Sequence, residues 1–470
     1  MLFLTGEASA SAQVVTNSAD SGPGTLRSAI TNAASGAVIT FDPSQSGATI
    51  TLSNPLPINT NLTIDASALP GGVQINGNAA VTVFNVASNI TVFLNSLTIT
   101  NGYSTNFGGG IYNNGTLTLT NCTLSGNFAY DFGGGIDNEG TLTLNNCTLL
   151  GNSATGPDAD GGGIGNDGTM TLNQCTLSGN SATNYGGGGG IYNDGTLSMN
   201  QCTLSGNSSL LSGGGICNQF APLLTLNQCT LSGNIVFRDG NGGGGIFNEY
   251  GTLTLNQCTL SGNSAPELGG GIFNFDEGTA MITNTIVGGN SGGDIFNRDT
   301  IIYGGSNLVQ VVVNDEGGFT LGPALTGAPN LAPLGNYGGP TQTMPPLPGS
   351  PAIGAGSVAA NTFSTDQRGY SRTQNGLIDL GAVELLSPAA SPPVLENITV
   401  PAGGGANNLQ FTFTNASAAD FTVLTAPNVS LALTNWTVLG EVQQVAPGQY
   451  QFTDPQAATN RARFYRVRSP

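Results

Sequence analysis

The side chains best suited to chemistry in this chain are carboxylates that recur at one position of a repeated sequence. If consecutive copies form neighbouring parallel strands, these side chains stand ~4.8 Å apart, near the ~5 Å carboxyl separation of retaining glycosidases. They are also ordinary turn residues, because Asp and Asn followed by Gly are common in turns. We expect the turn role, with divalent-cation bridging between coils and a glycosidase pair as alternatives. The column comprises Asn114, Glu139, Asp167, Asp194 and Glu249.

A second acidic candidate is the insert GPDADGGG, which carries Asp158 and Asp160. Ca²⁺ prefers carboxylate oxygens, so this insert is the best candidate loop for a calcium ion. It lacks the GGxGxDxUx nonapeptide of calcium-binding β-rolls. We therefore assign no catalytic, cofactor-binding or metal-binding residue. Calcium is the one cofactor that we keep as an alternative.

The chain contains neither His nor Lys. Without His there is no Ser-His-Asp or Cys-His arrangement, and without Lys there is no Schiff-base chemistry. Polysaccharide lyases can use Arg as a base, but only Arg238 and Arg298 lie within the repeats and neither belongs to a recognisable motif. We expect both to be solvated loop residues, and we expect a protein that is not an enzyme.

The charge balance restricts the partners. The chain has 27 acidic residues against nine Arg, a net charge of −18, which argues against binding to nucleic acid. Four of the nine Arg lie in the final segment RARFYRVRSP. A last strand with solvated Arg side chains explains them, and an anionic partner is the alternative: a sorting receptor, a surface polysaccharide or the acidic body of another copy. These four are Arg461, Arg463, Arg466 and Arg468.

A repeat must position these residues. Its cleanest copy, at 108–127, reads GGGIYNNGTLTLTNCTLSGN, and it occurs seven times before a last echo, GGDIFN, at a spacing of 23 to 30 residues. A period in this range indicates a solenoid. The isoleucines that follow the glycines are Ile111, Ile136, Ile164, Ile191, Ile216, Ile246, Ile272 and Ile295.

Within one copy, apolar and polar residues alternate as in strands. Ile111, Leu117 and Leu119 face inward, and Asn121 and Asn127 interrupt or close the alternation as corners. We expect three short strands per coil of about 27 residues, stacked into an all-β, right-handed parallel β-helix with ladders of Asn amides. A leucine-rich-repeat horseshoe is the rival, but the repeat lacks its LxxLxLxxN core.

Six of the seven Cys occupy one position of the repeat. Parallel neighbours place equivalent residues ~4.8 Å apart, whereas disulfides prefer Cβ atoms ~3.8 Å apart, so we expect free thiols packed as core residues. Cys217 stands at a different position. The column comprises Cys122, Cys147, Cys175, Cys202, Cys229 and Cys258.

The outward positions form a two-column Thr-x-Thr array that resembles the regular faces of ice-binding solenoids. Thr is also a favoured outward residue on any strand, and Leu223 breaks one column, so we expect an ordinary strand surface. The array comprises Thr116/Thr118, Thr141/Thr143, Thr169/Thr171, Thr196/Ser198 and Thr252/Thr254.

The chain divides into several expected segments. None contains the ~18 consecutive apolar residues of a membrane-spanning helix. A cap in the 307–386 segment could close the open sheet end through ion pairs of Asp366, Arg368, Arg372, Asp379 and Glu384. The segments are a residual signal peptide at 1–12, cleaved after Ala12; a strand and capping helix at 13–36, the helix over 25–34; a β-helix at 37–306; terminal coils and cap at 307–386; a linker at 387–395; and a β-sandwich-like module at 396–470.

Several short motifs resemble a known family. GNYGGPTQT, SPAIGAG, TDQRGYSR and DLGAVE, between residues 335 and 384, resemble the choice-of-anchor Q module that follows the β-helix of secreted and surface-attached bacterial proteins. DSGPGTLRSAI, at 20–30, is similar to the entry segment of the same proteins. The resemblance covers most of residues 14–386. It implies an exported bacterial protein and offers no catalytic residues to transfer.

Together these patterns favour a non-enzymatic extracellular or cell-surface protein. We expect a rigid structural or adhesive rod that binds a surface polysaccharide or cell-envelope component and could assemble into fibres with further copies. The alternatives are a polysaccharide-active enzyme, either a glycoside hydrolase or a lyase, and an ice-binding solenoid.

Overall fold

The chain forms two compact units, unit 1 over Met1–Glu384 and unit 2 over Leu385–Pro470, and each is described by itself. The expected signal peptide at 1–12 and linker at 387–395 lie outside the described residues. The structure is a computed structural model that describes residues 13–157, 159–184, 186–220, 222–238, 242–385, 396–399, 409–414, 421–428, 436–446, 449–454 and 463–468.

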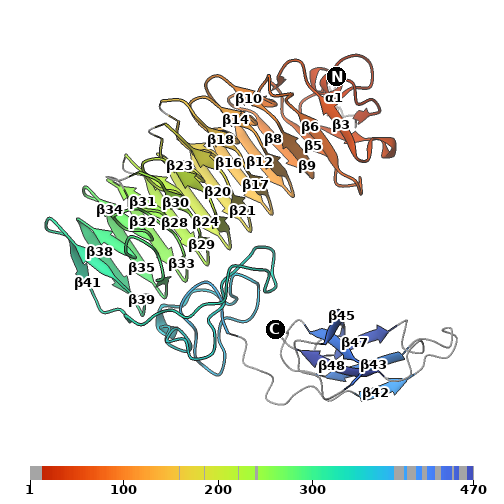
Figure 1. The fold of residues 1–470 in the computed structure, drawn as a ribbon. Coiled ribbons are helices and arrows are strands. Elements are labelled where there is room, and N and C mark those ends of the chain that lie inside the picture. The colour runs from red at the N-terminus through yellow and green to blue at the C-terminus, as the bar shows by residue number, and fades with distance from the viewer. Residues whose placement is uncertain are drawn as a thin grey trace, which may run out of the picture. The chain divides into compact units, whose positions relative to one another are not determined.

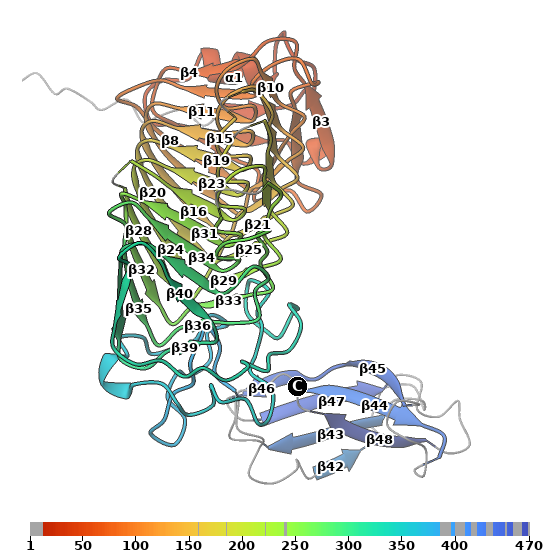
Figure 2. The ribbon, with the colours of Figure 1, turned by 60° about the vertical axis from the view of Figure 1, so that its left-hand side comes forward.

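Unit 1 is a parallel β-solenoid with about 27 residues per turn (Figure 1). In each turn the chain passes through three long sheets, numbered here in the order in which the repeat visits them, and Figure 2 shows their strands stacked along the solenoid. Coils in the repeat region add a two-residue strand in a fourth sheet, so they contain four strands where we expected three.

Sheet 1 holds the Gly-Gly-Gly-Ile strands. They are β4 (Leu56–Ile58), β7 (Phe84–Val86), β11 (Ile111–Asn113), β15 (Ile136–Asn138), β19 (Ile164–Asn166), β23 (Ile191–Asn193), β27 (Ile216–Asn218), β31 (Ile246–Glu249), β34 (Ile272–Phe275), β37 (Ile295–Asn297) and β40 (Val312–Asn314).

Sheet 2 holds the Thr-x-Thr strands. They are β1 (Gln13–Val15), β2 (Ala37–Phe41), β5 (Leu62–Asp65), β8 (Thr91–Asn95), β12 (Thr116–Thr120), β16 (Thr141–Asn145), β20 (Thr169–Asn173), β24 (Thr196–Asn200), β28 (Leu223–Asn227), β32 (Thr252–Asn256), β35 (Thr279–Thr283), β38 (Thr300–Gly304) and β41 (Phe319–Leu321).

Sheet 3 follows the cysteine column, and the short sheet 4 closes each turn. Sheet 3 contains β3 (Ala48–Thr51), β6 (Val73–Asn76), β9 (Leu97–Thr100), β13 (Thr123–Ser125), β17 (Thr148–Leu150), β21 (Thr176–Ser178), β25 (Thr203–Ser205), β29 (Thr230–Ser232), β33 (Thr259–Ser261), β36 (Ile286–Val287) and β39 (Leu308–Val309). Sheet 4 contains β10 (Tyr103–Ser104), β14 (Phe128–Ala129), β18 (Ser153–Ala154), β22 (Ser181–Ala182), β26 (Ser208–Ser209) and β30 (Ile235–Val236).

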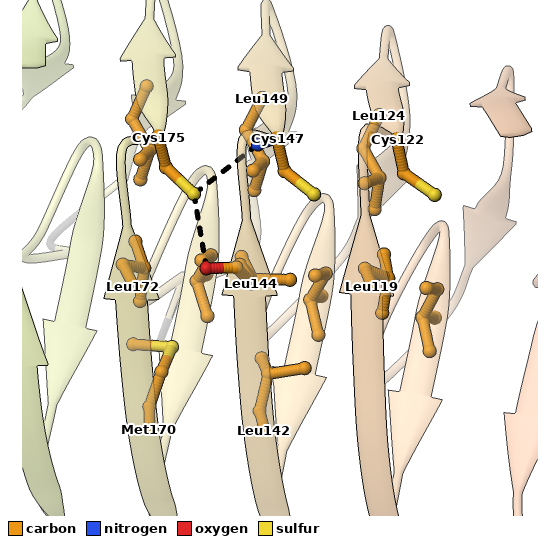
Figure 3. Close-up of a cluster of buried hydrophobic side chains, with 14 of the residues drawn as sticks. Leu119, Cys122, Leu124, Leu142, Leu144, Cys147, Leu149, Met170, Leu172 and Cys175 are labelled. Atoms are coloured by element: carbon orange, nitrogen blue, oxygen red, sulfur yellow. Dashed lines mark hydrogen bonds between the residues drawn. The ribbon is translucent and has the colours of Figure 1, made fainter. Parts of the chain in front are cut away.

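One apolar core runs through unit 1 from Val15 to Val309. Neighbouring coils pair identical repeat positions, such as Leu117 with Leu142. Each inward residue therefore packs on the equivalent residue of the next coil. Figure 3 shows the resulting rows of Leu and Cys side chains. The first glycine of each GGG is needed for the turn: Gly133 has a φ of 61°, and a Cβ on it would lie 2.2 Å from the Ile136 carbonyl oxygen.

Two buried ladders of Asn amides run along the core, as the repeat predicts. In one, Asn113 Nδ2 donates to Asn138 Oδ1 at 2.6 Å, and the pattern continues to Asn314. In the other, Asn127 Nδ2 donates to Asn152 Oδ1 at 2.9 Å. Of the two expected corner residues, Asn121 is an exposed corner with a φ of 53°, whereas Asn127 lies inside and is 1% exposed.

The N-terminal end of the solenoid is covered by α1 (Leu26–Thr31), a shorter helix than the expected 25–34. Thr25 caps it by accepting a hydrogen bond from Ser28 N. Leu26 and Ile30 are buried in the solenoid core, and the helix contacts β1 and β4. A 3₁₀ turn, η1 (Pro43–Gln45), follows β2.

Residues 329–384, called the strap below, do not close the C-terminal end of the solenoid. They run back along the outer face of sheet 3, beside β33 and β39 in Figure 1. Gln201 Nε2 donates to the Asp366 carbonyl at 3.0 Å, and Ala382 N donates to Thr259 Oγ1 at 3.0 Å. The strap contains one 3₁₀ turn, η2 (Val358–Ala360).

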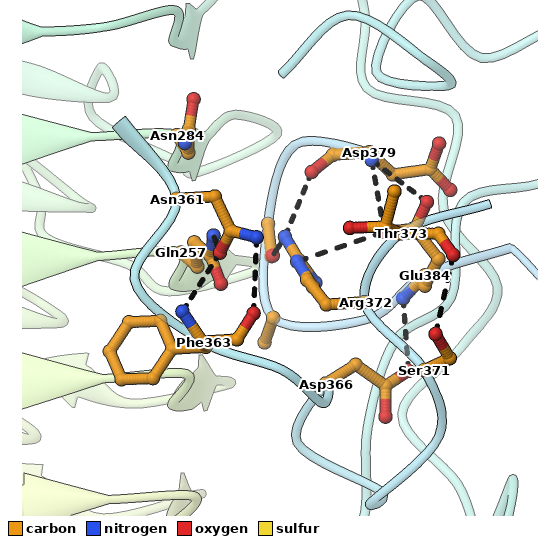
Figure 4. Close-up of polar contacts among 12 residues, drawn as sticks. Gln257, Asn284, Asn361, Phe363, Asp366, Ser371, Arg372, Thr373, Asp379 and Glu384 are labelled. Carbon is orange, nitrogen blue, oxygen red and sulfur yellow. Dashed lines mark hydrogen bonds and ion pairs between the residues drawn. The ribbon is translucent and has the colours of Figure 1, made fainter. Parts of the chain in front are cut away.

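The ion pairs expected to close the sheet end instead hold the strap together (Figure 4). Arg368 pairs with Asp366 at 2.8 Å in a buried site. Arg372 is fully buried and donates to the Asp379 and Gly381 carbonyls at 2.8 and 2.6 Å. Burial, and then the Asp379 carboxylate, raise the pKa of Glu384 to about 8.

Unit 2 is a small β-sandwich of two antiparallel sheets. Phe413 of one sheet lies edge-on to Phe421 at 5.0 Å between ring centroids, which joins the sheets through an aromatic core. One sheet contains β42 (Glu396–Thr399), β43 (Leu409–Thr414), β47 (Gln449–Asp454) and β46 (Gln443–Ala446), and the other contains β45 (Thr437–Glu441), β44 (Thr422–Ala426) and β48 (Phe464–Arg468).

Candidate functional site

The carboxylate column lies where the strands of sheet 1 end. Glu139, Asp167 and Asp194 follow β15, β19 and β23 directly and are exposed. Burial, and then the neighbouring Glu139, raise the pKa of Asp167. The next coil places Gln219 at this position, and its amide donates to Glu249. The structure therefore brings the expected column together, with Gln219 as an additional member.

The most perturbed carboxylate was not among the sequence candidates. Asp137 lies in β15 on the outward side of sheet 1, between Tyr112 and Gly165 of the adjacent coils, and is 3% exposed. Burial, and then the charges of Asp167 and Glu139, raise its pKa to about 8. A signal was available in the sequence: the Ile-x-Asn position that is aromatic in several copies carries Asp in this one.

Aromatic side chains explain this burial. The outward row of sheet 1 continues through Tyr192, Cys217 and Phe247, which form a second apolar cluster. In the first two copies the residue before the GGG packs on this row: the Phe107 ring stacks 5.9 Å from Tyr112, and the Phe132 ring lies 6.5 Å from Tyr192. Inward and outward positions of sheet 1 are therefore both apolar, and Asp137 is a carboxyl group placed in an apolar row.

The surroundings of Asp137 contain groups that could act with it. Tyr112 Oη donates to Glu139 Oε1 at 2.8 Å. Gly165 has no side chain, and a Cβ there would lie 3.3 Å from Asp137 Oδ1. A carboxyl group that keeps its proton at neutral pH thus lies near carboxylates in more exposed positions. Such a difference between neighbouring carboxyl groups is what general acid and base roles require.

The candidate calcium loop gains no support from its described half. Asp158 lies outside the described residues. Asp160 Oδ1 accepts a hydrogen bond from Gly187 N at 2.7 Å, which ties two coils together. Across the described part of the chain, no group of three or more His, Cys, Asp or Glu is placed to hold a metal ion.

The two arginines of the repeat region differ in their surroundings. Arg238 is exposed on the loop after β30. Arg298 is not simply solvated: its Nε lies 3.2 Å from Asp315 and 3.4 Å from Glu316, and its guanidinium lies 5.4 Å from the centre of the Phe275 ring. These contacts give Arg298 a structural role beside the last coils.

The Thr-x-Thr array forms the outer face of sheet 2. Thr116 pairs in register with Thr141, and Thr118 with Thr143, so both columns are continuous there. Leu223, which is 54% exposed, interrupts the first column, and Met281 interrupts the second. The face is therefore regular over only a few coils.

The cysteines are free and buried, all seven of them. Cys175 Sγ approaches the Leu144 carbonyl at 3.4 Å and accepts from Cys147 N at 3.4 Å (Figure 3). Burial, and then the Asp160 carboxylate, raise the pKa of Cys217. The six thiols of the column are buried in the apolar core, so the column serves packing.

The arginines of the final strand are divided between two roles. Arg463 Nη1 pairs with Asp454 at 2.6 Å, and Tyr465 Oη donates to the same carboxylate at 2.8 Å. Arg466 is exposed on β48, an edge strand of its sheet. Arg461 lies outside the described residues. One of these arginines therefore stabilises unit 2, and Arg466 is available to solvent.

Comparison with known proteins assigns neither a family nor a function to the chain. The chain matches no known protein family model, and no curated protein is similar to it. The described residues contain no helix long and apolar enough to cross a membrane.

Proposed function

We propose that this protein is a non-enzymatic, exported rod that displays binding surfaces outside the cell. The observation that carries the proposal is the pair of buried amide ladders, which join coil to coil from Asn113 to Asn314 and from Asn127 to Asn290. Each coil is bonded to the next through its backbone, its core and these amides. Such a body resists bending, which suits a spacer or an adhesive scaffold.

The surfaces left free suit a hydroxyl-rich partner. The outer face of sheet 2 presents exposed Thr hydroxyls. Glu139, Asp167 and Asp194 lie along one side of this face, two residues before strands β16, β20 and β24 begin. Hydroxyls and carboxylates form hydrogen bonds with sugars, so the partner class is a surface polysaccharide or another cell-envelope component. The resemblance to exported bacterial proteins supports the same placement.

Two measurements test this proposal. Immunogold electron microscopy of the producing cells is expected to label the envelope, and binding assays on purified envelope polysaccharides are expected to show retention that weakens in an Asp167→Asn/Asp194→Asn variant. The matched control is Glu267→Gln, which removes an exposed carboxylate on a loop away from the column. Labelling confined to the cytoplasm, or no retention by any envelope fraction, would overturn the proposal.

A second function is favoured by one observation: Asp137 is buried beside exposed carboxylates, and burial raises its pKa to about 8. In a glycoside hydrolase, Asp137 would give its proton to the glycosidic oxygen as that bond breaks, while Asp167 or Glu139 activates water or attacks the sugar carbon. Reducing-end release from polysaccharides that is lost in Asp137→Asn and Asp167→Asn, and kept in Glu267→Gln, would establish this activity. Equal release by all three variants would exclude it.

A further inference from the structure

At the C-terminal end of the solenoid, two of the three long sheets end in unpaired strands. Sheet 3 is covered there, because Leu325 pairs with β39: Val309 N donates to the Leu325 carbonyl at 2.8 Å. Sheet 1 ends at β40 and sheet 2 ends at β41, and neither strand has a neighbour on its outer side among the described strands of unit 1. In Figure 1, β41 lies at the tip of the stack. Apolar side chains around this end are unusually exposed, between 42% and 52%: Val311, Val313, Phe319, Leu321 and Leu325.

The strap leaves the edges of β40 and β41 unpaired because its own contacts are made on the outer face of sheet 3. Its hydrogen bonds reach Gln201, Thr230 and Thr259, and its apolar residues Ala352 and Leu380 pack on Ile286 and Leu308. An unpaired strand edge with exposed apolar side chains is a template for pairing with another chain. Solenoids normally cover such an end with a polar capping repeat.

The opposite end is already closed. There α1 contacts β1 and β4 and buries Leu26, Ala29 and Ile30 in the core. A second copy could meet this end only by displacing the helix, so head-to-tail stacking is blocked. Unit 2 has edge strands too, but β48 presents the exposed Arg466, the kind of residue that protects an edge from pairing.

We propose that two copies of this chain join through the C-terminal ends of their solenoids, with β40 and β41 and their exposed apolar side chains at the interface. A two-fold axis places the same edge of each copy against the other, so that strands parallel within each solenoid are antiparallel across the interface. The contact ends with two copies, because the far ends are closed by α1. The inference does not depend on the proposed rod function.

Size and charge set the strength of this contact. Each copy offers five half-exposed apolar side chains and two short strand edges. The surface area that they can bury lies at the lower end of the range for stable protein–protein interfaces. Asp299, Asp315 and Glu316 lie beside it and outnumber Arg298. We therefore expect a dimer of micromolar affinity that strengthens with added salt.

Sedimentation equilibrium of the full chain over a range of concentrations tests the proposal. We expect a monomer–dimer equilibrium and at least a ten-fold loss of affinity in Leu321→Lys, which places a charge on the edge strand. The matched control is Leu223→Lys, an equally exposed leucine in the middle of sheet 2, which should dimerise normally. A monomer at all concentrations, equal dimers in both variants, or open-ended oligomers would overturn the proposal.

Crosslinking keeps the proposal testable if Leu321→Lys does not fold. The native thiols are buried, so an introduced surface cysteine is the reactive one. A short bismaleimide should link Val313→Cys chains in pairs and leave Ser44→Cys chains, which are altered near the N-terminal end, unlinked. Linking of Ser44→Cys chains instead would contradict the end-to-end arrangement.

Discussion

At the scale of the residue, the carboxyl group of Asp137 illustrates how burial changes chemistry. It occupies an outward position, yet it lies in the row of sheet 1 that Phe107 and Phe132 pack on, and it is only 3% exposed. Because its pKa rises from 3.8 to about 8, the folded protein holds a proton there that the unfolded chain releases above about pH 4. Its contribution to stability is therefore complete below about pH 4 and is lost as the pH rises to 8.

The first prediction follows from this fall in stability with rising pH. Asp137→Asn should raise the free energy of unfolding at pH 8 by a few kcal/mol, on the order of the cost of ionising the buried carboxyl group, and the gain should vanish near pH 4. Urea denaturation at several pH values measures it, with Glu267→Gln as the exposed control. A gain that does not depend on pH would show that Asp137 is not protonated in the native state.

The second prediction concerns the buried amide ladder that runs from Asn127 to Asn290. Asn180 accepts from the main-chain and side-chain N–H groups of Asn152 and donates to the Leu149 carbonyl and to Asn207 Oδ1. Asn180→Ala leaves these buried groups unpaired and should cost about 2–4 kcal/mol of unfolding free energy. The control is Asn173→Ala on sheet 2, a half-buried residue whose Nδ2 donates to Asn145 Oδ1 at 2.9 Å; this change should cost about 1 kcal/mol or less. Equal losses would contradict the role of burial.

At the scale of the element, the strap is held by one side chain above others. Gln367 is fully buried, and its Nε2 donates to the Cys202 carbonyl at 3.1 Å and to Thr203 Oγ1 at 3.0 Å. Its Oε1 accepts from Thr230 Oγ1 at 2.6 Å. This amide thus joins the strap to two adjacent strands of sheet 3.

The third prediction is that Gln367→Ala loosens the strap while the coils stay folded. Hydrogen–deuterium exchange should show faster exchange within the strap, residues 329–384, and unchanged protection of β12 and β16, because the solenoid core does not include the strap. Thr373→Ala, at an exposed strap position, is the control. Exchange that accelerates equally throughout unit 1 would show that strap and coils unfold together.

The fourth prediction concerns the outer face of sheet 2. Leu223 and Met281 interrupt its Thr columns, so the matched rows of hydroxyls extend over few coils. We expect a freezing point indistinguishable from that of the buffer. Thermal-hysteresis measurement on the full chain checks this, and a gap between melting and freezing that grows with protein concentration would revive the ice-binding alternative.

At the scale of the whole molecule, charge is distributed unevenly. In unit 2 four acidic residues balance four Arg, so the net charge of −18 lies entirely on unit 1. Like charges on a compact body repel one another, and salt screens that repulsion over a Debye length of ~8–10 Å.

The fifth prediction is that salt stabilises unit 1. Raising NaCl from low to physiological levels and above should increase its free energy of unfolding by about 1–2 kcal/mol. Thermal unfolding of the full chain measures it, and the transition of the neutral unit 2 serves as the internal control. A transition of unit 1 that salt leaves unmoved would show that its acidic groups are neutralised by partners or protons.

The sequence by itself determined the architecture of unit 1. Its period, its alternation and its repeated Ile, Leu, Cys and Asn positions predict a parallel solenoid with an apolar interior, free thiols and amide ladders, and the structure confirms each. This works because each coil contacts mainly its neighbours, so identical residues meet identical residues in every turn. The residue pattern of one repeat therefore determines both the strands of a coil and the way in which successive coils stack.

Only the tertiary structure decided which equivalent positions are covered. Thr123, Thr148 and Thr176 remain partly exposed on sheet 3, whereas Thr203, Thr230 and Thr259, in the same motif, are buried under the strap. Asp137 is buried between Tyr112 and Gly165 of the adjacent coils, and the edges of β40 and β41 stay unpaired because the strap runs along sheet 3. The strap contacts join residues more than a hundred positions apart, as Gln367 and Thr230 are. The repeat that fixes each coil carries no record of the strap contacts.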